Sequence, residues 1–282
     1  MSKVDKFYEA KNLFQCPKCK KKIRFHGGAL VCKKEHTFDI AAKGYVNLLQ
    51  QTKSFKGYDA GFFKSRRAFF AAGYYDHIVG EVVDTACRLL GNMEAPVVLD
   101  AGCGEGGYST AIEAAFAGSG VAGQVLAFDI ASDAIKVAAG DDNVKWMVAD
   151  ITNIPVKDGV VDCILDVFTP ANYKEFNRVL ADNGYLIKVV PGSAHLQELR
   201  RAVSDQLQNK EYSNEDVTDY FEDHYELISR VKCTATRELS GENLDNLVRM
   251  TPLLFDVDKS RLDLSGVKEI TIEGEVLVGR KK

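Results

Sequence analysis

The 282-residue sequence contains no apolar run of about 20 residues, the length that a helix needs to cross a bilayer. Its first eleven residues also lack the apolar stretch of a secretory signal peptide. No internal repeat and no low-complexity tract is present. We therefore expect neither a membrane protein, nor an exported protein, nor a repeat array. The length predicts one substantial core with a small additional module.

Cysteine is scarce, with seven residues, and three of them lie in a short pattern near the N-terminus. Two residues separate Cys16 from Cys19, and three separate Cys32 from His36, which gives C-x2-C-x12-C-x3-H. Two such pairs can close a tetrahedral zinc site that leaves no position for water, so we predict a structural zinc site. His26 lies between the pairs and is the alternative fourth ligand, but the regular spacing favours His36.

The remaining cysteines lie in apolar or helical segments and are predicted to be small core residues. They are Cys87, Cys103, Cys163 and Cys233. Thiols that are reserved for zinc fit a reducing compartment, so the expected location is cytoplasmic.

Acidic residues are few in the N-terminal part, although the whole chain has a formal net charge of −4. Residues 1–67 contain 16 Lys and Arg and 5 Asp and Glu, which gives a charge balance of +11. The remaining residues contain 20 Lys and Arg and 35 Asp and Glu, which gives a charge balance of −15. The basic residues surround the zinc pattern and suit a phosphate backbone, with Phe25, Phe38 and Tyr45 as stacking surfaces. The alternative is a solvated basic face, because charge asymmetry alone identifies no partner.

One run of residues has the form of a nucleotide-like cofactor site. An apolar strand ends at Asp100, and Gly102, Gly104 and Gly106 complete the spacing D-x-G-x-G-x-G. A dinucleotide fingerprint is spaced G-x-G-x-x-G, so this motif points away from NAD. Glycines here let the backbone approach a ligand and adopt torsions that other residues avoid. A second acid, Asp129, ends the next strand; the alternative is a glycine turn in an ordinary α/β domain.

Strands and helices alternate from residue 96, which predicts an α/β fold with a doubly wound sheet. The predicted strands are Val97–Ala101, Gln124–Asp129, Val144–Ala149, Val161–Phe168 and Gly184–Val190, with helices beginning near Tyr108, Ser132 and Asn172. Two closing strands flank a helix at Glu242–Met250. They are Tyr225–Leu239 and Val267–Arg280.

The predicted domains follow from these segments. Residues 1–50 form a zinc-binding, RNA-recognition domain that is too small for its own core, and Gly44–Leu49 closes it as a short strand or turn. Residues 51–95 hold a mobile linker, to about residue 63, and two leading helices that Gly73 divides. Residues 96–282 form the cofactor-binding domain, with a polar helical insertion at about 194–223 over the cofactor side.

Several segments occur in one order along nearly the full length of the chain. They are the zinc pattern, Lys43–Leu49, Arg66–Phe69, Gly73–Tyr75, Asp100–Gly106, Pro191–Gly192 with His195–Leu196, and Met250–Pro252. Together they resemble the bacterial large-subunit (23S) ribosomal RNA guanine-N1 methyltransferases. The glycine motif alone is shared by class I methyltransferases in general, whereas the zinc pattern joined to it is specific.

The resemblance implies a class I methyltransferase fold, in which the two closing strands form an antiparallel edge. It also implies S-adenosylmethionine as cofactor and a zinc domain that helps to hold RNA. The implied reaction is methylation of N1 of one of two neighbouring guanines in a 23S rRNA hairpin that lines the peptide exit tunnel. The family also implies a homodimer, and some members confer macrolide resistance. The implied zinc ligands are Cys16, Cys19, Cys32 and His36, and the cofactor-binding residues are Tyr75, Asp100, Gly102, Gly104, Glu105, Gly106, Asp129, Asp150 and His195.

The resemblance also assigns individual roles. Asp129 is expected to hold the ribose hydroxyls, and Asp150, after the third strand, the adenine amine. Both also fit ordinary turn positions at strand ends. Tyr75 fits a core position at a helix break and His195 fits a helix cap, while Glu105 fits a solvated loop acid, although carboxylates rarely occupy glycine turns for packing.

The segment after the fourth strand, Asp166–Asn172, faces the transferred methyl group in this fold. It lacks the Asn/Asp-Pro-Pro-Tyr pattern of exocyclic amine methylators and the Pro-Cys of cytosine-C5 enzymes, which agrees with a ring-nitrogen acceptor. Phe168 is predicted to stack on the base and Asp166 to accept its proton. The alternative for Asp166 is a buried turn acid.

Two other function classes fit parts of the sequence. A protein or small-molecule methyltransferase would use the zinc domain to contact another protein, which the acidic balance of the later residues favours. A non-enzymatic RNA-binding module would have lost catalysis, but the three glycines and both carboxylates of the motif are present. Salt-dependent RNA binding separates the rRNA enzyme from the first alternative, and cofactor binding separates either enzyme from the second.

Overall fold

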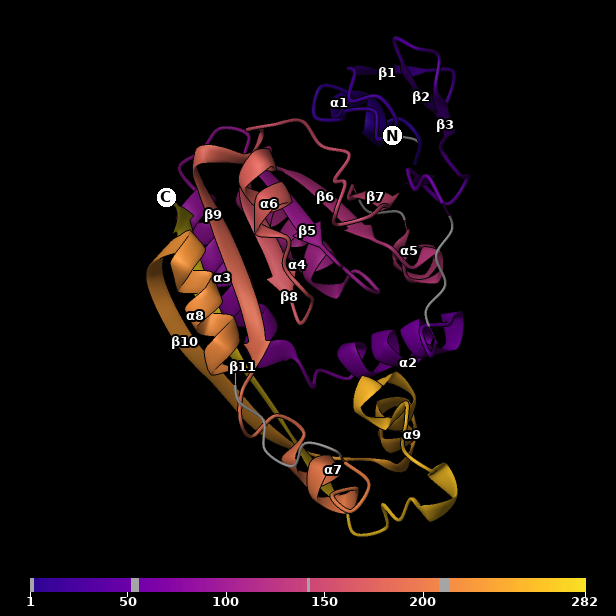
Figure 1. Cartoon of the computed structure of the whole chain (residues 1–282), viewed down its shortest axis with the longest axis vertical. Coiled ribbons are helices and arrows are strands. Elements are labelled where there is room, and N and C mark those ends of the chain that lie inside the picture. The colour runs from indigo at the N-terminus through magenta and orange to yellow at the C-terminus, as the bar shows by residue number, and fades with distance from the viewer. Residues whose placement is uncertain (1–2, 52–55, 141–142, 208–213) are drawn as a thin grey trace.

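A mixed β-sheet forms the centre of the molecule (Figure 1). The computed structural model describes residues 3–51, 56–140, 143–207 and 214–282. The strands lie across the sheet in the order β10-β11-β9-β8-β5-β6-β7-β4. Their bounds are β4 (Tyr45–Asn47), β5 (Val97–Ala101), β6 (Gln124–Asp129), β7 (Lys145–Val148), β8 (Val161–Val167), β9 (Leu180–Pro191), β10 (Tyr225–Glu238) and β11 (Glu269–Lys281).

The predicted α/β fold is confirmed. The five predicted strands, β5 to β9, pair in parallel, and β9 begins four residues earlier than expected, at Leu180. Every residue of β5 is buried, as expected of a strand that helices cover on both faces. β11 lies antiparallel to both β9 and β10, which confirms the predicted antiparallel edge.

Helices cover both faces of the sheet (Figure 1). One apolar cluster joins α3, α4 and α5 to one face, and a second joins α6 and α8 to the other. Successive residues of β5 alternate between the clusters: Val98 belongs to the first and Leu99 to the second. The helix bounds are α2 (Ala60–Ala71), α3 (Asp76–Leu90), α4 (Gly107–Ser119), α5 (Ser132–Ala138), α6 (Tyr173–Val179), α7 (Gln197–Ala202), α8 (Glu215–His224) and α9 (Gly241–Met250), with short 3-10 turns at Pro252–Leu254 and Lys259–Arg261.

The segment before the main domain differs in part from the prediction. Residues expected to belong to a linker start the helix α2 at Ala60, because the Asp59 carboxylate accepts a hydrogen bond from the Phe62 N–H at 2.8 Å and caps the helix. The predicted linker residues 52–55 lie outside the described residues. The predicted break between the two leading helices is present at Gly73, whose φ is +83°.

The N-terminal segment contains α1 (Lys6–Glu9) and a small antiparallel sheet of β1 (Ile23–His26), β2 (Ala29–Cys32) and β3 (Thr37–Asp39). The predicted closing strand is present as β4, but β4 joins the edge of the main sheet, parallel to β7. The zinc segment is therefore attached to the main domain by backbone pairing, which its sequence did not indicate.

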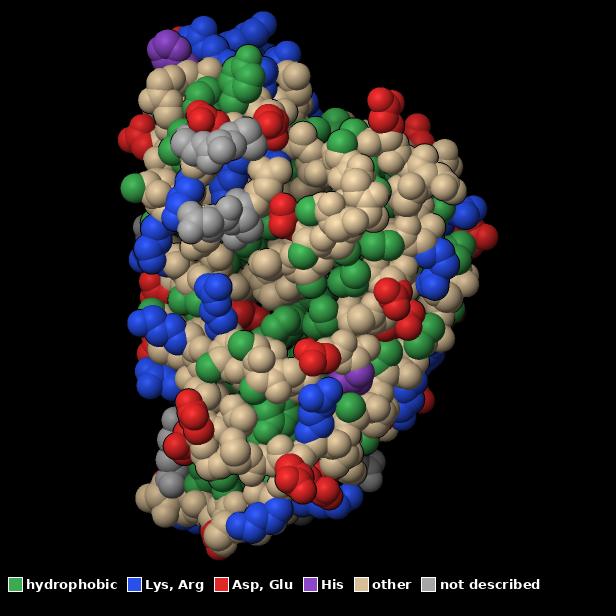
Figure 2. Space-filling view, turned by 180° about the vertical axis from the view of Figure 1, so that it is seen from behind, with side chains coloured by type: hydrophobic (Ala, Val, Ile, Leu, Met, Phe, Trp, Pro, Cys, Tyr) green, Lys and Arg blue, Asp and Glu red, His purple; other side chains and the backbone are tan. Residues whose placement is uncertain are grey.

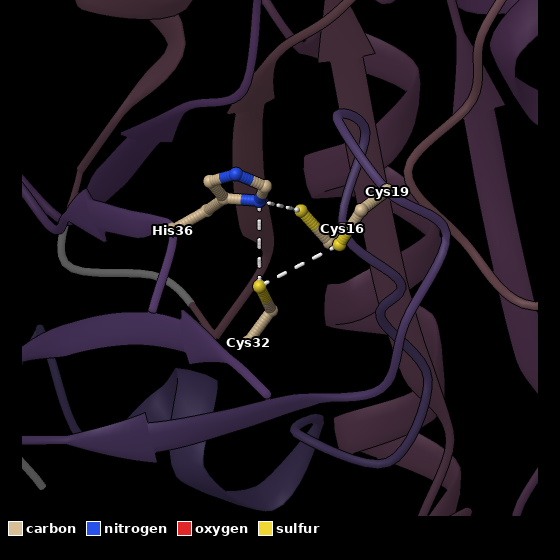
Figure 3. Close-up of side chains that lie close together, drawn as sticks. All are labelled: Cys16, Cys19, Cys32 and His36. Carbon is tan, nitrogen blue, oxygen red and sulfur yellow. Dashed lines mark hydrogen bonds between the residues drawn. The ribbon is translucent and has the colours of Figure 1, made fainter. Parts of the chain in front are cut away.

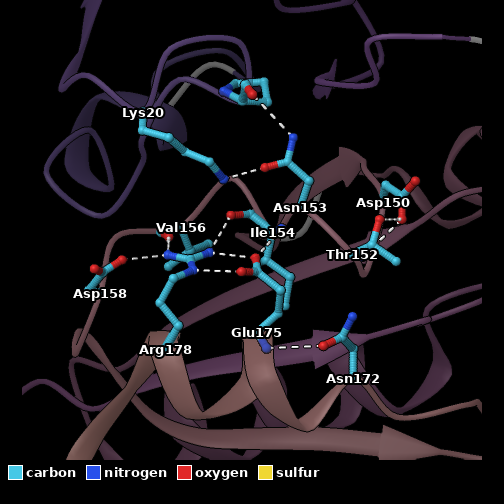
Figure 4. A network of polar contacts seen from close by, with 11 residues as sticks. Lys20, Asp150, Thr152, Asn153, Ile154, Val156, Asp158, Asn172, Glu175 and Arg178 are labelled. Atoms are coloured by element: carbon cyan, nitrogen blue, oxygen red, sulfur yellow. Dashed lines mark hydrogen bonds and ion pairs between the residues drawn. The ribbon is translucent and has the colours of Figure 1, made fainter.

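Side chains strengthen this attachment (Figure 4). Asn153, in the loop after β7, donates to the Pro17 carbonyl at 3.1 Å and accepts a hydrogen bond from Lys20. In the same network, Arg178 on α6 pairs with Glu175 at 2.7 Å and donates to the Ile154 carbonyl at 2.8 Å. The loop that carries Asn153 is thus held by both the zinc segment and α6.

The described part of the predicted insertion contains α7, which packs on β11, and α8, which packs on β10 and β11. Residues 208–213 of this insertion lie outside the described residues. Among the helices that the structure describes, none has the length and apolar character to cross a membrane.

Candidate zinc centre and cofactor site

The predicted zinc ligands converge (Figure 3). The ligand atoms of Cys16, Cys19, Cys32 and His36 all lie within 4.8 Å of one another. Nδ1 of His36 is 3.4 Å from Sγ of Cys16 and 3.5 Å from Sγ of Cys32, and the Cys19 and Cys32 sulfurs are 3.7 Å apart. His26 is exposed at the end of β1 and is not a member of this cluster, so the spacing argument for His36 is confirmed.

These separations fit a bound zinc ion. Zn–S bonds of about 2.3 Å and Zn–N bonds of about 2.0 Å at tetrahedral angles place neighbouring ligand atoms about 3.5 to 3.8 Å apart. The cluster supplies three thiols and one imidazole, with ligand pairs from two separate turns. Because four protein ligands close the coordination shell, the ion is structural.

A cavity of about 450 Å³ lies at the carboxyl ends of β5, β6 and β8, where the strand order reverses across β5. Ligands bind at such a switch point in open α/β sheets. The face opposite to that of Figure 1 has a hollow with a hydrophobic floor near its middle (Figure 2). The cavity is lined by Tyr58, Phe62, Phe63, Arg66, Gly102, Gly104, Phe128, Asp129, Ile130, Ala131, Ala149, Ile151, Val167, Phe168, Thr169, Pro170 and Pro252.

The glycine turn between β5 and α4 forms the inner wall. Gly102, Gly104 and Gly106 all have positive φ, at +76°, +55° and +85°. A Cβ on Gly102 would lie 2.6 Å from Oγ1 of Thr169, and one on Gly106 would lie 2.4 Å from the Trp146 ring. The expected torsions are therefore present, but Gly106 allows close packing of protein on protein and does not line the cavity.

Asp129 lies at the end of β6 with both carboxylate oxygens in use. One oxygen accepts the Gly104 N–H at 3.0 Å, and the other accepts the Ala131 N–H at 2.8 Å. The carboxylate thereby ties the glycine turn to the neighbouring strand end. Burial raises the pKa of Asp129, and the two backbone donors oppose that rise. Each oxygen keeps a further lone pair for a ligand hydroxyl.

Asp100 was expected to bind the cofactor, but it is not among the residues that line the cavity. Its carboxylate is 2% exposed and accepts a hydrogen bond from Oγ of Ser109 at 2.5 Å. Burial raises the pKa of Asp100 to about 7. The residue thus lies behind the glycine turn and connects β5 to α4.

This buried acid predicts a pH-dependent stability. A carboxyl group whose pKa is higher in the folded state stabilises the fold below its unfolded pKa of 3.8, and this stabilisation is lost as pH rises through about 7. At about 1.4 kcal/mol per pH unit over the two units from pH 5 to the folded pKa, the free energy of unfolding of the wild type should fall by about 3 kcal/mol relative to Asp100→Asn between pH 5 and pH 8. Urea unfolding of both proteins measures the difference, in which titrations common to both cancel. If the free energies of unfolding of the two proteins changed with pH in the same way, the raised pKa of Asp100 would be contradicted.

Arg66 belongs to the basic residues that were expected to suit a phosphate backbone, and no contact with the cofactor was predicted for it. In the structure, Nε of Arg66 donates to the Glu105 carboxylate at 2.6 Å, and the guanidinium lies 5.8 Å from the centre of the Tyr75 ring. Tyr75 and Glu105 are 3% and 5% exposed. Two of the predicted cofactor residues therefore contact the cavity through Arg66.

Three further aromatic residues in the cavity were missed, namely Tyr58, Phe62 and Phe63 at the start of α2. They line the same cavity as Gly102 and Gly104, and they belong to the segment that was interpreted as a linker. The helix-capping Asp59 was the signal that could have identified this helix start.

Phe168 and His195 form a pair beyond the end of β8. Phe168 lines the cavity, has a positive φ of +54°, and its ring lies 5.5 Å from the His195 ring, centre to centre. Nδ1 of His195 accepts the Glu273 N–H at 3.2 Å, so the neutral ring carries its proton on Nε2. Burial lowers the pKa of His195 to about 4, and the ring is neutral at pH 7.

Asp166 is fully buried near the end of β8, and Nζ of Lys188 on β9 donates to its Oδ2 at 2.7 Å. The same ammonium donates to the Thr169 carbonyl at 3.3 Å. Burial raises the pKa of Asp166 to about 6, and the charge of Lys188 opposes the rise. Asp166 is not on the cavity wall but anchors a lysine that holds the segment after Phe168.

Asp150 follows β7, and its carboxylate accepts hydrogen bonds from the Thr152 backbone and hydroxyl at 2.9 and 2.7 Å. Its two neighbours, Ala149 and Ile151, line the cavity. Asp150 therefore flanks the site and is oriented by its own turn.

The cavity walls fit the cofactor that the resemblance implies. The apolar side chains of Ile130 and Ile151 lie on the wall beside the Asp129 carboxylate, which suits a purine ring attached to a ribose. Gly104 has only the Arg66 side chain within 4 Å of an added Cβ, so the backbone is open to a ligand there. The acidic groups Asp129 and Glu105 suit the positive charges of a sulfonium and an ammonium.

Family models match two separate parts of the chain. The zinc ribbon model described as RlmA, N-terminal, matches residues 14–55, and the model described as methyltransferase domain matches residues 98–184. Among solved structures, the YcgJ protein from Bacillus subtilis overlaps 72% of this chain and 99% of its own, with a TM-score of 0.48 and 15% identity.

Curated relatives match over most of the chain. YxjB of Bacillus subtilis (strain 168), named for 23S rRNA (guanine-N(1)-)-methyltransferase activity, is 33% identical over 96% of this chain and 98% of its own. The 23S rRNA (guanine(748)-N(1))-methyltransferase of Streptomyces fradiae is 28% identical over 92% of this chain and 93% of its own. A similarly named protein of Micromonospora griseorubida is 30% identical over 88% of each chain. The chain therefore belongs to the family of 23S rRNA (guanine-N(1)-)-methyltransferases, with S-adenosylmethionine and structural zinc as its cofactors.

Proposed function

We propose that the protein methylates N1 of a guanine in 23S rRNA, in the hairpin that lines the peptide exit tunnel. The similarity to YxjB over 96% of this chain carries the proposal, because it includes both the zinc ribbon and the cofactor domain. The names of these relatives do not favour the alternative, a zinc-containing protein or small-molecule methyltransferase. In the same proposal the protein acts in the cytoplasm, where rRNA is assembled. It also acts as a homodimer, which sedimentation would detect as a mass twice that of the 31.1 kDa chain.

The charge distribution supports an RNA substrate. Blue side chains gather at the top of the face in Figure 2, over the zinc segment, and continue down its left edge. This part of the chain has the +11 balance of residues 1–67. Because Asn153 holds Pro17 and Lys20, the basic ribbon is fixed relative to the cofactor cavity. RNA phosphates bound on the ribbon would place the target at a defined distance from the methyl group.

A second cavity of about 550 Å³ adjoins the first and supports an acceptor on the α8 side. Phe168, Thr169 and Pro170 line both cavities, and Tyr173, Lys188 and Tyr220 line the second alone. Aromatic walls suit a base that has left its helix, since every base presents a face for stacking. We propose that Phe168 packs against the target guanine.

The bound cofactor supplies a methyl group that its sulfonium already activates. The chain must hold the guanine in line with that methyl group and favour loss of the N1 proton. Loss of this proton leaves negative charge on O6, which a nearby cation stabilises. Lys188 is such a cation on the wall of the second cavity, and Asp166 holds it in place. We therefore propose that Asp166 is a positioning residue that acts through Lys188.

The replacement Asp166→Asn tests this role. We expect kcat to fall at least tenfold, while the Kd for S-adenosylmethionine stays within threefold, because Asp166 does not line the cofactor cavity. The wild-type rate should fall as pH decreases through about 6, where Asp166 takes up a proton, and the variant should lack this limb. A variant rate within twofold of the wild type, with an unchanged pH profile, would remove Asp166 from the mechanism.

The function itself is tested by methyl transfer from labelled S-adenosylmethionine to purified 23S rRNA, with 16S rRNA and a protein extract as parallel substrates. An N1 methyl group blocks the Watson–Crick edge of guanine, so reverse transcriptase should stop beside it. The expected result is incorporation into 23S rRNA alone, with one stop in the tunnel hairpin. Incorporation into protein or small molecules alone would favour the alternative enzyme class.

A further inference from the structure

The charges around the cofactor cavity are unbalanced. Among its lining residues in the described part of the chain, Arg66 is the single lysine or arginine, whereas Asp129 is on the wall and Glu105 is next to it. S-adenosylmethionine carries a sulfonium, an ammonium and a carboxylate. Two acidic groups suit the two cations, but they repel the carboxylate unless a positive group lies near it.

Arg66 is held where such a group is needed. Its Nε–H is bonded to Glu105 at 2.6 Å, and Nε lies 3.6 Å from the position of a Cβ on Gly104. The side chain is 20% exposed. A guanidinium has five N–H donors, and the bond to Glu105 uses the one on Nε. The two terminal nitrogens form the fork that binds a carboxylate through two parallel hydrogen bonds.

We propose that Arg66 binds the carboxylate of the methionine part of S-adenosylmethionine and makes the site selective for cofactors that carry this carboxylate. Glu105 orients the guanidinium, and the Tyr75 ring, 5.8 Å away, limits its movement. This accounts for a buried acid within a glycine turn, since Glu105 serves the arginine as well as the ligand. The proposal concerns cofactor selection and does not depend on which substrate receives the methyl group.

The test compares S-adenosylmethionine with its decarboxylated form, which keeps the sulfonium and the amine but lacks the carboxylate. Dissociation constants for both compounds are measured by calorimetry on the full zinc-loaded chain. The wild type should bind S-adenosylmethionine roughly 10- to 100-fold more tightly, the range expected for charge-assisted hydrogen bonds. Arg66→Gln should weaken binding of S-adenosylmethionine by a similar factor and leave the decarboxylated compound within threefold.

Arg67→Gln is the matched control, because the Arg67 guanidinium donates to the Val137 carbonyl and the residue does not line the cavity. Arg67→Gln should keep the wild-type ratio of the dissociation constants for the decarboxylated compound and S-adenosylmethionine. If Arg66→Gln does not fold, Arg66→Lys retains the charge without the fork and should give an intermediate ratio. A wild type that binds both compounds equally, or an Arg66 variant that loses both equally, would overturn the proposal. No RNA is present, so these outcomes are independent of the proposed rRNA methylation.

Discussion

Replacing Gly106 with alanine is expected to destabilise the fold and to abolish most cofactor binding. Gly106 has a φ of +85°, and an added Cβ would lie 2.4 Å from the Trp146 ring and 3.0 Å from Cβ of Ala138. Trp146 is fully buried on β7, so its ring cannot move away without displacing its neighbours. The left-handed torsion costs about 1–2 kcal/mol for alanine, and overpacking adds about 1–3 kcal/mol. The turn must shift, and with it the Gly104 backbone that Asp129 holds.

Gly120→Ala is the matched control for this substitution. Gly120 ends α4 with a φ of +72°, but no atom of the residues that the structure describes lies within 4 Å of its added Cβ. This variant therefore carries the torsional cost without the clash. In urea unfolding, the free energy of unfolding should be about 1–3 kcal/mol lower for Gly106→Ala than for Gly120→Ala. In titrations with S-adenosylmethionine, Gly106→Ala alone should bind the cofactor at least tenfold more weakly. Equal behaviour of the two variants would show that the contact with Trp146 does not constrain the turn.

Removal of one zinc ligand is expected to abolish specific RNA binding while leaving cofactor binding within a few fold. Cys32→Ser deletes a thiol at the centre of the cluster, 3.7 Å from Cys19 and 3.5 Å from His36. Structural zinc contributes about 10–16 kcal/mol in isolated zinc fingers, so the small sheet that carries the cluster should lose its order. The cofactor cavity is lined by residues from Tyr58 onward, so its walls do not include this sheet.

Cys87→Ser is the control, because Cys87 is a partly exposed thiol on α3 outside the cluster. Bound zinc is measured by atomic absorption, and the affinities for rRNA and S-adenosylmethionine are measured on the same samples. Cys32→Ser should contain little zinc, and its RNA affinity should fall to that of non-specific binding. Full zinc content, or unchanged RNA affinity after zinc loss, would contradict the assigned role of the ribbon.

The features that the sequence predicted are local ones. The spacing of Cys16, Cys19, Cys32 and His36 follows from ligand pairs on short turns, and the structure brings these four residues together. The glycine motif likewise follows from one strand, one turn and one helix start. In each case neighbouring residues in the chain decide the geometry, so a single sequence is sufficient.

The features that the sequence did not predict depend on partners far apart in the chain. Arg66 and Glu105 are 39 residues apart, and Lys188 reaches Asp166 because β8 and β9 pair with those two residues in register. The addition of β4 to the edge of the main sheet depends in the same way on β7. Periodicity and spacing describe single segments, and they carry no information on which segments pack side by side.

The cofactor site is expected to transfer a methyl group to N1 of a guanine in 23S rRNA. The most direct measurement is mass spectrometry of nucleosides from 23S rRNA of a strain lacking the gene, after incubation with the protein and S-adenosylmethionine. We expect 1-methylguanosine to be formed by the wild type and to be reduced at least tenfold with Asp166→Asn. A methyl group on another position of guanine or on another base, or an unmethylated 23S rRNA with cofactor binding intact, would contradict it.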